Sequence, residues 1–347
     1  MSMSEAFDEQ LMAAVKRRRA VVNAEIPDEI PAEDPERLWS AARHLLDAGG
    51  KRLRPTVLMM VAEALTDADP ETVDYRSFET LTGGEVDLVR AAVSVEIVHT
   101  FTLIHDDIMD DDDLRRGVEA VHEVYDEEMA IIAGDTLYAK AFDLMLNAGA
   151  TPERTNRALE LLTETCTKIC VGQALDVDFE TRREVLPDEY LEMIDHKTAV
   201  LYGASAGIPA ILMGADQDTV ESVYRFGRQV GQAFQIQDDV LDLTTPSEKL
   251  GKRRGSDLIE GKQTIITVHA RDQGVDVDSL LPDEGEITEA DVDDAVAILE
   301  AAGSIDYARD MAQELVVNGK AHLRTLPDNE VRRYLSGIAD YLIERDY

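Results

Sequence analysis

The chain has 347 residues, 44% of them hydrophobic, and its 71 Asp and Glu against 34 Lys and Arg give a formal net charge of −37. This size allows a substantial buried core, whereas the acidity excludes a general affinity for nucleic acid and argues against an electrostatic membrane anchor. An acidic, lysine-poor surface is typical of a halophilic protein, because strong salt screens such self-repulsion.

The N-terminal region has no apolar core before a cleavage site, so we expect no secretory signal. No run of about 18 apolar residues occurs, which predicts that nothing spans a membrane. Together these features predict a cytoplasmic protein.

Helical periodicity dominates the long segments. The clearest helices cover residues 90–110, 157–180 and 219–243, and no clean alternating strands flanked by hairpin turns occur. Acidic connections containing Pro or Gly are expected at 26–36, 66–87 and 271–294. Because no Pro/Gly/Ser linker divides the chain, we predict one all-α domain over residues 1–347, folded as a helical bundle.

Two aspartate clusters share one spacing. In a helix, residues i and i+4 lie on one face, and Mg²⁺ prefers oxygen ligands while keeping waters and substrate phosphates as others. Two such helices facing each other could hold several Mg²⁺ ions between them, although acidic composition alone could produce one cluster. The spacing DDxxD occurs in "HDDIMD" as Asp106, Asp107 and Asp110, and in "QDDVLD" as Asp238, Asp239 and Asp242.

Basic residues stand beside glycines and helix-end signals, although the chain otherwise avoids lysine. Binding a polyphosphate to so acidic a protein requires local charge reversal, so these groups indicate phosphate-bearing substrates. A helix-terminal charge or a surface ion pair is the alternative for any single group. The groups are Lys51, Arg52 and Arg54 in "GGKRLRP", Arg115 and Arg116 in "DDLRRG", Lys197 in "DHKTA", Lys252 in "GKRRGSD" and Lys262 in "EGKQT".

The ordered set of motifs resembles the trans-isoprenyl diphosphate synthases, which include farnesyl and geranylgeranyl diphosphate synthases. The resemblance covers residues 43–267 and also includes "AGD" at 133–135, "GQALD" at 172–176 and "FQIQDDVLD". It implies an all-α bundle around a deep central cavity, a homodimer, and Mg²⁺-dependent head-to-tail condensation of isopentenyl diphosphate with an allylic diphosphate of five, ten or fifteen carbons.

The resemblance also implies roles for individual residues. Three Mg²⁺ ions would bridge the aspartates to the allylic diphosphate, with Asp106, Asp110 and Asp238 as principal ligands and Asp107, Asp239 and Asp242 beside them. Arg115, Lys197 and Lys252 would contact the allylic diphosphate, whereas Lys51, Arg54, His99 and Arg116 would hold isopentenyl diphosphate. Gln173, Thr198 and the Lys197 carbonyl would stabilise the allylic cation, and Gln235 would order the second aspartate helix. His99 lies two turns before Asp106, which places both on one helix face.

Product length is expected to depend on Phe101, five residues before Asp106 and roughly 7 Å deeper along the helix. A bulky residue here is associated in the resembling family with short products, and the first aspartate motif lacks the insertion of bacterial farnesyl synthases. We therefore expect an archaeal type of enzyme with a C20 product, with C15 as the main alternative.

Other functions share some of these features. A terpene or squalene-type synthase also uses aspartate-rich helices and Mg²⁺, but it should lack "GGKRLRP" and the paired arginines of "LRRG". A non-catalytic partner subunit is expected to lose one aspartate cluster, and an acidic ion-binding protein has no need of the cationic residues.

Overall fold

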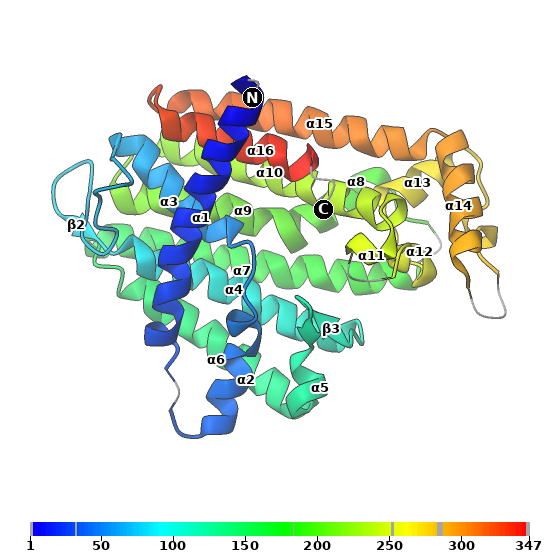
Figure 1. Cartoon of the computed structure of the whole chain (residues 1–347), viewed down its shortest axis with the longest axis horizontal. Helices are drawn as coiled ribbons and strands as arrows, with labels where there is room; N and C mark the ends of the chain where they lie inside the picture. The colour runs from blue at the N-terminus through cyan, green and yellow to red at the C-terminus, as the bar shows by residue number, and fades with distance from the viewer. Residues whose placement is uncertain (1–2, 32, 183, 251–252, 283–286, 345–347) are drawn as a thin grey trace. The chain divides into compact units, whose positions relative to one another are not determined.

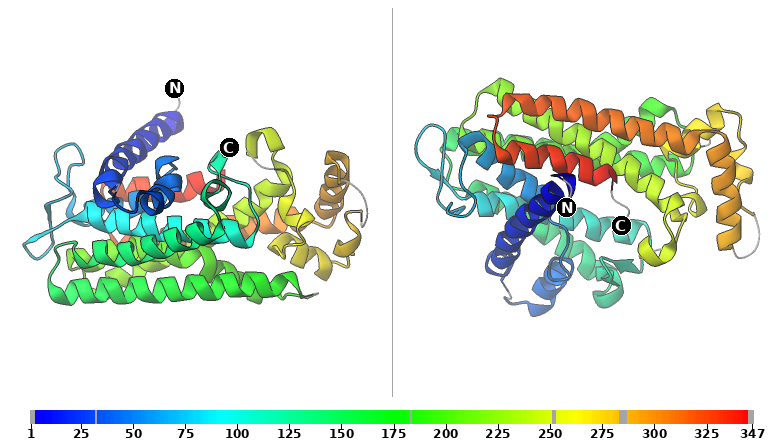
Figure 2. Two further views of the ribbon diagram at one scale, coloured as in Figure 1. Left: turned by 90° about the horizontal axis from the view of Figure 1, so that it is seen from below. Right: turned by 45° about the horizontal axis from the view of Figure 1, so that its top comes forward.

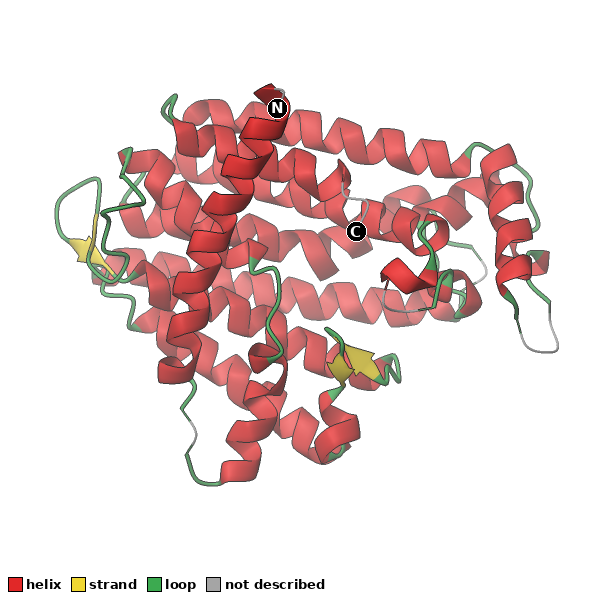
Figure 3. Cartoon of the chain, in the orientation of Figure 1, coloured by secondary structure: helices red, strands yellow, loops and turns green. Residues whose placement is uncertain are grey.

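The computed structural model describes residues 3–31, 33–182, 184–250, 253–282 and 287–344, and its described part is mostly helical (Figures 1 and 3). The prediction of an all-α fold is confirmed, and the helices expected at 90–110, 157–180 and 219–243 are present. The chain forms two compact units. Unit 1 comprises Met1–Cys166, Ala204–Tyr224 and Leu323–Gly337, and unit 2 comprises Thr167–Gly203, Arg225–His322 and Ile338–Tyr347. The single-domain organisation stays a prediction.

The elements of unit 1 are mainly long helices joined by short connections. They are α1 Met3–Glu29, α2 Glu36–Asp47, α3 Leu53–Thr66, β1 Phe78–Glu79, β2 Glu85–Val86, α4 Leu88–Met109, β3 Leu114–Arg115, β4 Val118–Glu119, α5 Val121–Tyr125, α6 Glu127–Leu146 and a 3₁₀ turn Leu323–Thr325.

Unit 2 contains shorter helices, and four helices have residues in both units. Those within unit 2 are α8 Pro187–Ile194, a π-helix Asp195–Ala199, α11 Ser247–Leu250, α12 Ser256–Ile259, α13 Ile265–Asp272, a 3₁₀ turn Val277–Ser279, α14 Glu289–Ala301 and α15 Ser304–His322. The four shared helices are α7 Pro152–Glu180, α9 Val200–Met213, α10 Gln217–Thr244 and α16 Glu330–Glu344.

The core of unit 1 is built on α3 and α4, whose residues are apolar on nearly every face. A helix of this kind must be covered on all sides, and α1 lies across both while α6 packs along α4 (Figure 2). By length and composition α4 could cross a membrane, but 72% of its most apolar window is buried within the protein, as in a core helix.

A buried polar cluster ties the acidic 66–87 connection to this core. Glu63, which is fully buried, accepts hydrogen bonds from Arg18 Nε (2.8 Å) and from the Tyr75 hydroxyl (2.6 Å). Burial, with the nearby Glu63 charge, raises the pKa of Tyr75 beyond its usual range. Because a buried charge is costly without a partner, this cluster stabilises the approach of α1 and of the connection to α3.

The expected connections at 26–36 and 271–294 and the expected absence of strands were each wrong in part, since α14 already begins at Glu289. Helix α1 continues through Pro27 to Glu29, where burial of Ile26 and Ile30 compensates for the missing backbone donor. Short antiparallel hairpins also form where no strand was expected, β1 with β2 and β3 with β4 (yellow in Figure 3).

Candidate active site

The first aspartate motif ends α4 in unit 1. Asp107 is fully buried, whereas Asp106 and Asp110 are half-buried, and Asp110 is the C-cap. Asp111 then adopts a left-handed conformation (φ 54°), and the Asp112 amide donates to the Asp107 carbonyl (2.9 Å). This bond closes the helix end as in a Schellman motif. Asp111 and Asp112, for which the sequence suggested no role, therefore end the helix.

Arg115 binds the acidic end of α4 directly. Its Nε donates to Asp107 Oδ1 (2.5 Å) and its Nη2 donates to Asp112 Oδ2 (2.6 Å). Burial raises the pKa of Asp107 to about 6, although the Arg115 charge and hydrogen bond oppose this rise. The second carboxylate oxygen of Asp107 is buried and has no hydrogen-bond partner among the described residues.

The next residue, Arg116, points to different partners because it occupies a tight turn. Arg115 pairs with Val118 across the β3–β4 hairpin, and the two central residues, Arg116 (φ 54°) and Gly117 (φ 79°), both have positive φ. This is the backbone that a two-residue type I′ connection requires. Neighbouring arginines are thereby directed to separate sites.

Arg116 joins the hairpin to the end of α2. Its Nη1 donates to the carbonyls of Leu45 (3.1 Å) and Gly49 (2.8 Å), and its Nη2 lies 3.2 Å from Glu96 Oε1. At Gly50 (φ 150°) a Cβ atom would lie 3.2 Å from Arg116 Cζ. The second glycine of "GGKRLRP" therefore leaves room for an arginine from "LRRG".

Arg116, Arg54 and His99 form a cluster in unit 1 in which the two arginines carry the positive charge. Burial, together with the charges of Arg54 and Arg116, lowers the pKa of His99 well below its usual value. Burial also lowers the pKa of Arg116, and Glu96 opposes this effect. His99 is therefore neutral near pH 7 and can accept or donate a hydrogen bond. Lys51 is exposed at the start of the same segment.

Phe101 belongs to α4, and its ring packs toward α6. It is 7% exposed, and its ring packs edge-on against Tyr138 at 5.0 Å and against His105 at 5.9 Å between centroids. His105 therefore has a packing role. Tyr138 in turn packs against Phe142 at 5.0 Å, so an aromatic row continues along α6 from Phe101.

In unit 2, "DHKTA" forms the π-helix. Asp195, which is 5% exposed, accepts from Arg228 Nε (2.9 Å), and its second oxygen accepts from Arg228 Nη2. A Cβ atom at Gly172 would lie 2.2 Å from the Lys197 amide nitrogen. The glycine of "GQALD" thus allows α7 to touch the backbone of the π-helix, an element often found at functional sites.

Side chains of the π-helix are connected to both neighbouring helices. Lys197 Nζ lies 2.6 Å from Asp176 Oδ2 on α7, and the Thr198 hydroxyl donates to Gln235 Oε1 (2.9 Å) on α10. Gln235 Nε2 then donates to Asp239 Oδ1 at 3.1 Å. This network orders the π-helix relative to the second aspartate motif.

The three aspartates of α10 differ in their surroundings. Asp239 also accepts from the Tyr190 hydroxyl (2.5 Å), and burial with the Asp257 charge raises the pKa of Asp239 to about 8. The buried Asp242 accepts from the Ser256 hydroxyl (2.8 Å) and the Asp257 amide (3.2 Å). Asp242 thus binds the N-terminal end of α12, whereas Asp238 is half-buried on the same face of α10.

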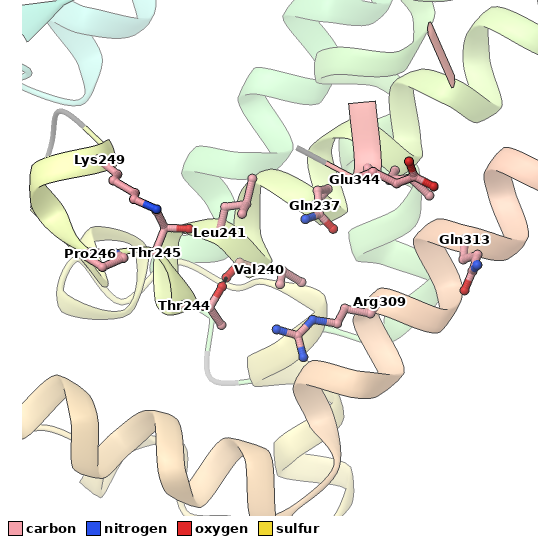
Figure 4. A pocket seen from close by; sticks show the side chains of 11 residues that line it. Gln237, Val240, Leu241, Thr244, Thr245, Pro246, Lys249, Arg309, Gln313 and Glu344 are labelled. Carbon is pink, nitrogen blue, oxygen red and sulfur yellow. Dashed lines mark hydrogen bonds between the residues drawn. The ribbon is translucent and has the colours of Figure 1, made fainter. Parts of the chain in front are cut away.

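A cavity of about 100 Å³ in unit 2 brings several predicted residues together. Its lining comprises Asp176, Tyr190, Met193, Ile194, Lys197, Thr198, Gln235, Asp239, Asp257, Lys262, Gln263 and Thr264. Gln173 is half-buried on α7, and Lys252 lies outside the described residues. A separate cavity of about 620 Å³ is lined by Gln237, Val240 and Leu241 of α10 and by Arg309 and Gln313 of α15 (Figure 4). It faces the side of α10 opposite to the aspartates.

Four polar residues beside the predicted ones were missed. Glu96 had a signal, because it is an acid inside an otherwise apolar helix, three residues before His99. Asp176 and Asp257 fall within the motifs "GQALD" and "GKRRGSD" but received no role, because they and Tyr190 contact site residues only through tertiary structure.

The carboxylates suit Mg²⁺ as part of a shared coordination sphere. No group of three or more His, Cys, Asp or Glu side chains within the described ranges could hold a metal ion by itself. Mg²⁺ commonly takes one or two carboxylates and completes its sphere with water and phosphate oxygens. The buried, unpartnered oxygen of Asp107 and the raised pKa of Asp239 fit this use, since a nearby cation favours the ionised form.

Helices ending in paired aspartates, together with buried arginines and a lysine-bearing π-helix, characterise an all-helical enzyme of the prenyltransferase class. Residues 35–299 match the family described as polyprenyl synthetase. The chain is 59% identical to the geranylfarnesyl diphosphate synthase of Natronomonas pharaonis, covering 96% of this chain and 98% of that protein. It is 46% identical to the geranylgeranyl diphosphate synthase of Methanosarcina mazei, over 97% and 98% of the two chains.

Solved structures agree. The geranylgeranyl pyrophosphate synthetase of Geoglobus acetivorans gives a TM-score of 0.85 at 40% identity, covering 95% of this chain and 99% of that one. The synthetase of the same name from Pyrococcus horikoshii gives 0.87 at 37% identity, covering 97% and 99%. The chain belongs to the polyprenyl synthetase family and is a trans-prenyltransferase acting on isoprenyl diphosphates, in a family that uses Mg²⁺ in catalysis.

Proposed function

We propose that the protein condenses isopentenyl diphosphate with allylic diphosphates, up to the fifteen-carbon one, to make geranylgeranyl diphosphate. The observation that carries this proposal is the divergence of two neighbouring arginines. Arg115 binds the aspartate end of α4, whereas Arg116 joins the cluster of Arg54 and His99. Two adjacent cationic sites suit two diphosphates, whereas a terpene cyclase binds only one.

In this proposal the allylic diphosphate is bound through the aspartates and nearby cations. Asp106, Asp110 and Asp238 provide carboxylate oxygens for three Mg²⁺ ions, and Arg115, Lys197, Lys252 and Lys262 contact the diphosphate itself. When bound, Mg²⁺ stabilises the negative charge that develops on the leaving diphosphate. Asp107 and Asp239 support this arrangement from buried positions, and metal binding by Asp242 stays a prediction.

Isopentenyl diphosphate is held in this proposal by Lys51, Arg54, His99 and Arg116. A neutral His99 donates one hydrogen bond without adding a charge to neighbouring guanidinium groups. These contacts leave the alkene free to attack C1 of the allylic substrate.

The allylic cation is stabilised by oxygen lone pairs in unit 2. Because the Thr198 hydroxyl donates a hydrogen bond to Gln235, the lone pairs of the hydroxyl oxygen are available to a positive centre. Gln173 and the Lys197 carbonyl add similar dipoles, and preorganised dipoles cost no reorganisation during the reaction. The proton lost after the condensation goes to the departing diphosphate.

Geranylfarnesyl diphosphate, with 25 carbons, is the second candidate product. It is favoured by the 59% identity to the enzyme of that name from Natronomonas pharaonis. Phe101 supports the shorter product, because its packed ring fills the space one turn before the aspartates on α4. The smaller farnesyl product stays an alternative.

We also propose a cytoplasmic homodimer in which α6 contacts the partner. Four large apolar side chains of α6 are exposed to solvent: Ile131 (40%), Ile132 (48%), Tyr138 (38%) and Leu146 (56%). Such an apolar face on one helix is typical of a protein interface.

The function is tested by incubating the protein with labelled isopentenyl diphosphate, Mg²⁺ and each allylic diphosphate of five, ten or fifteen carbons. The products are dephosphorylated and separated by chromatography. Incorporation into a twenty-carbon alcohol supports the proposal, a 25-carbon alcohol favours the second candidate, and no incorporation at any salt concentration refutes the enzymatic proposal.

A further inference from the structure

Glu96 is a buried acid inside the apolar helix α4. It is 2% exposed, and its carboxylate oxygen Oε1 lies 2.5 Å from Arg52 Nη1 and 3.2 Å from Arg116 Nη2. An isolated buried carboxylate is costly, so two guanidinium partners explain how it is tolerated. Glu96 therefore joins two basic residues from different motifs.

The two arginines have different surroundings. Arg52 is 3% exposed and also donates to Asn23 Oδ1 (2.9 Å) and to the Leu46 carbonyl (2.6 Å). Arg116 is less buried, and among the described residues it otherwise donates only to backbone carbonyls. Arg52 is thus a fixed anchor, and Glu96 connects Arg116 to it.

The charges of both arginines also act on His99, which lies one turn after Glu96 on the same face of α4. Positive groups this close repel one another, and desolvation strengthens the repulsion. The Glu96 carboxylate opposes this repulsion at the two arginines it contacts.

We propose that Glu96 is a positioning residue that holds Arg116 against the fixed Arg52 and thereby sets the affinity for isopentenyl diphosphate. The inference rests on the proposed function, in which Arg116 binds that substrate. A contact to a diphosphate that does not react is made equally in the ground and transition states, so its loss raises KM and leaves kcat unchanged.

The test compares Glu96→Gln with Glu63→Gln, a control that removes another buried carboxylate of unit 1, one paired with Arg18. Steady-state kinetics are measured with each substrate varied in turn. Glu96→Gln is expected to raise KM for isopentenyl diphosphate roughly tenfold or more, the usual loss for a charge-assisted contact. Its kcat and its KM for the allylic substrate should stay within about twofold. The control should lower the melting temperature without separating the two KM values.

A double variant tests whether Glu96 acts through Arg116. If it does, Glu96→Gln should add little to the KM defect of Arg116→Gln, because residues acting as a unit are not additive. Should Glu96→Gln fail to fold, Glu96→Asp keeps the charge with a shorter reach and should raise the same KM by a smaller factor.

An unchanged KM for isopentenyl diphosphate in a folded variant, an equal rise in both KM values, or a fully additive double variant would overturn the inference. A wild-type protein that incorporates no isopentenyl diphosphate would instead refute the proposed function, so the two failures are distinguishable.

Discussion

Replacing Phe101 with alanine should lengthen the product by about one five-carbon unit. The side chain of Phe101 is only 7% exposed, and its ring fills the space between the α4 backbone and Tyr138. The residues one turn before it, Ile97 and Val98, are fully buried. Removing the ring moves the first obstacle along α4 by one turn, about 5.4 Å. This distance is close to the length that one isoprene unit adds to an extended tail.

The expected shift is relative to the wild-type product, from C20 to C25 or from C25 to a longer chain. Truncating a buried phenylalanine costs about 3–5 kcal/mol of stability, so folding is checked first by circular dichroism. Phe78→Ala is the control, since Phe78 is also buried in unit 1 (1% exposed) but lies in β1, outside the aspartate helix. Chromatography of the dephosphorylated products gives the readout. An unchanged length distribution in a folded Phe101→Ala protein would refute the reasoning.

Four further predictions follow from individual contacts. Gly172→Ala should abolish activity and lower the melting temperature, because its Cβ would lie 2.2 Å from the Lys197 amide nitrogen; wild-type activity would contradict the contact. Ile132→Glu should convert a dimer to a monomer in sedimentation experiments, whereas Val317→Glu, at a position on α15 that is 62% exposed against 48% for Ile132, should not; a dimer in both variants argues against α6 as the interface. Burial lowers the pKa of His99, so the unfolded chain binds the extra proton and stability should fall as pH drops below about 6.5. His99→Gln should flatten this dependence in denaturant titrations, and identical slopes would count against it. The net charge of −37 should make the protein lose stability when salt is diluted, because the Debye length grows to about 10 Å at 0.1 M; a melting temperature independent of salt would contradict this.

The sequence predicts the long helices well because their apolar periodicity is strong and extends over many turns. It does not predict the π-helix at "DHKTA". A π-helix differs from an α-helix by about one extra residue in the turn, and this barely changes the apolar periodicity of the sequence. The β3–β4 hairpin was also missed. Its strands are two residues long, and the only local signal is a glycine after two arginines.

Spacing can relate candidate site residues that share one helix, but it cannot relate partners that come from distant segments. Asp106 and Asp110, or His99 and Glu96, lie on one face of α4 and can be related by counting residues. Tyr190, by contrast, binds Asp239 although the two residues are 49 positions apart in the sequence. No periodic pattern connects two such positions, so only the folded structure brings them together.

Arg116 explains why "GGKRLRP" and "LRRG" occur together. Its guanidinium donates to two carbonyls at the end of α2 and contacts Glu96, which also binds Arg52. A lysine has three donors on a flexible stem and cannot satisfy these separated acceptors in one plane, whereas the five donors of arginine can. A Cβ atom at position 50 would crowd this guanidinium at 3.2 Å, so glycine gives Arg116 the most room there. In a chain that avoids lysine, the buried cations of unit 1 are arginines because each must bind several acceptors at once. An arginine that binds a second diphosphate from the "LRRG" turn therefore needs the carbonyl acceptors beside "GGKRLRP", so the two motifs are expected to occur together.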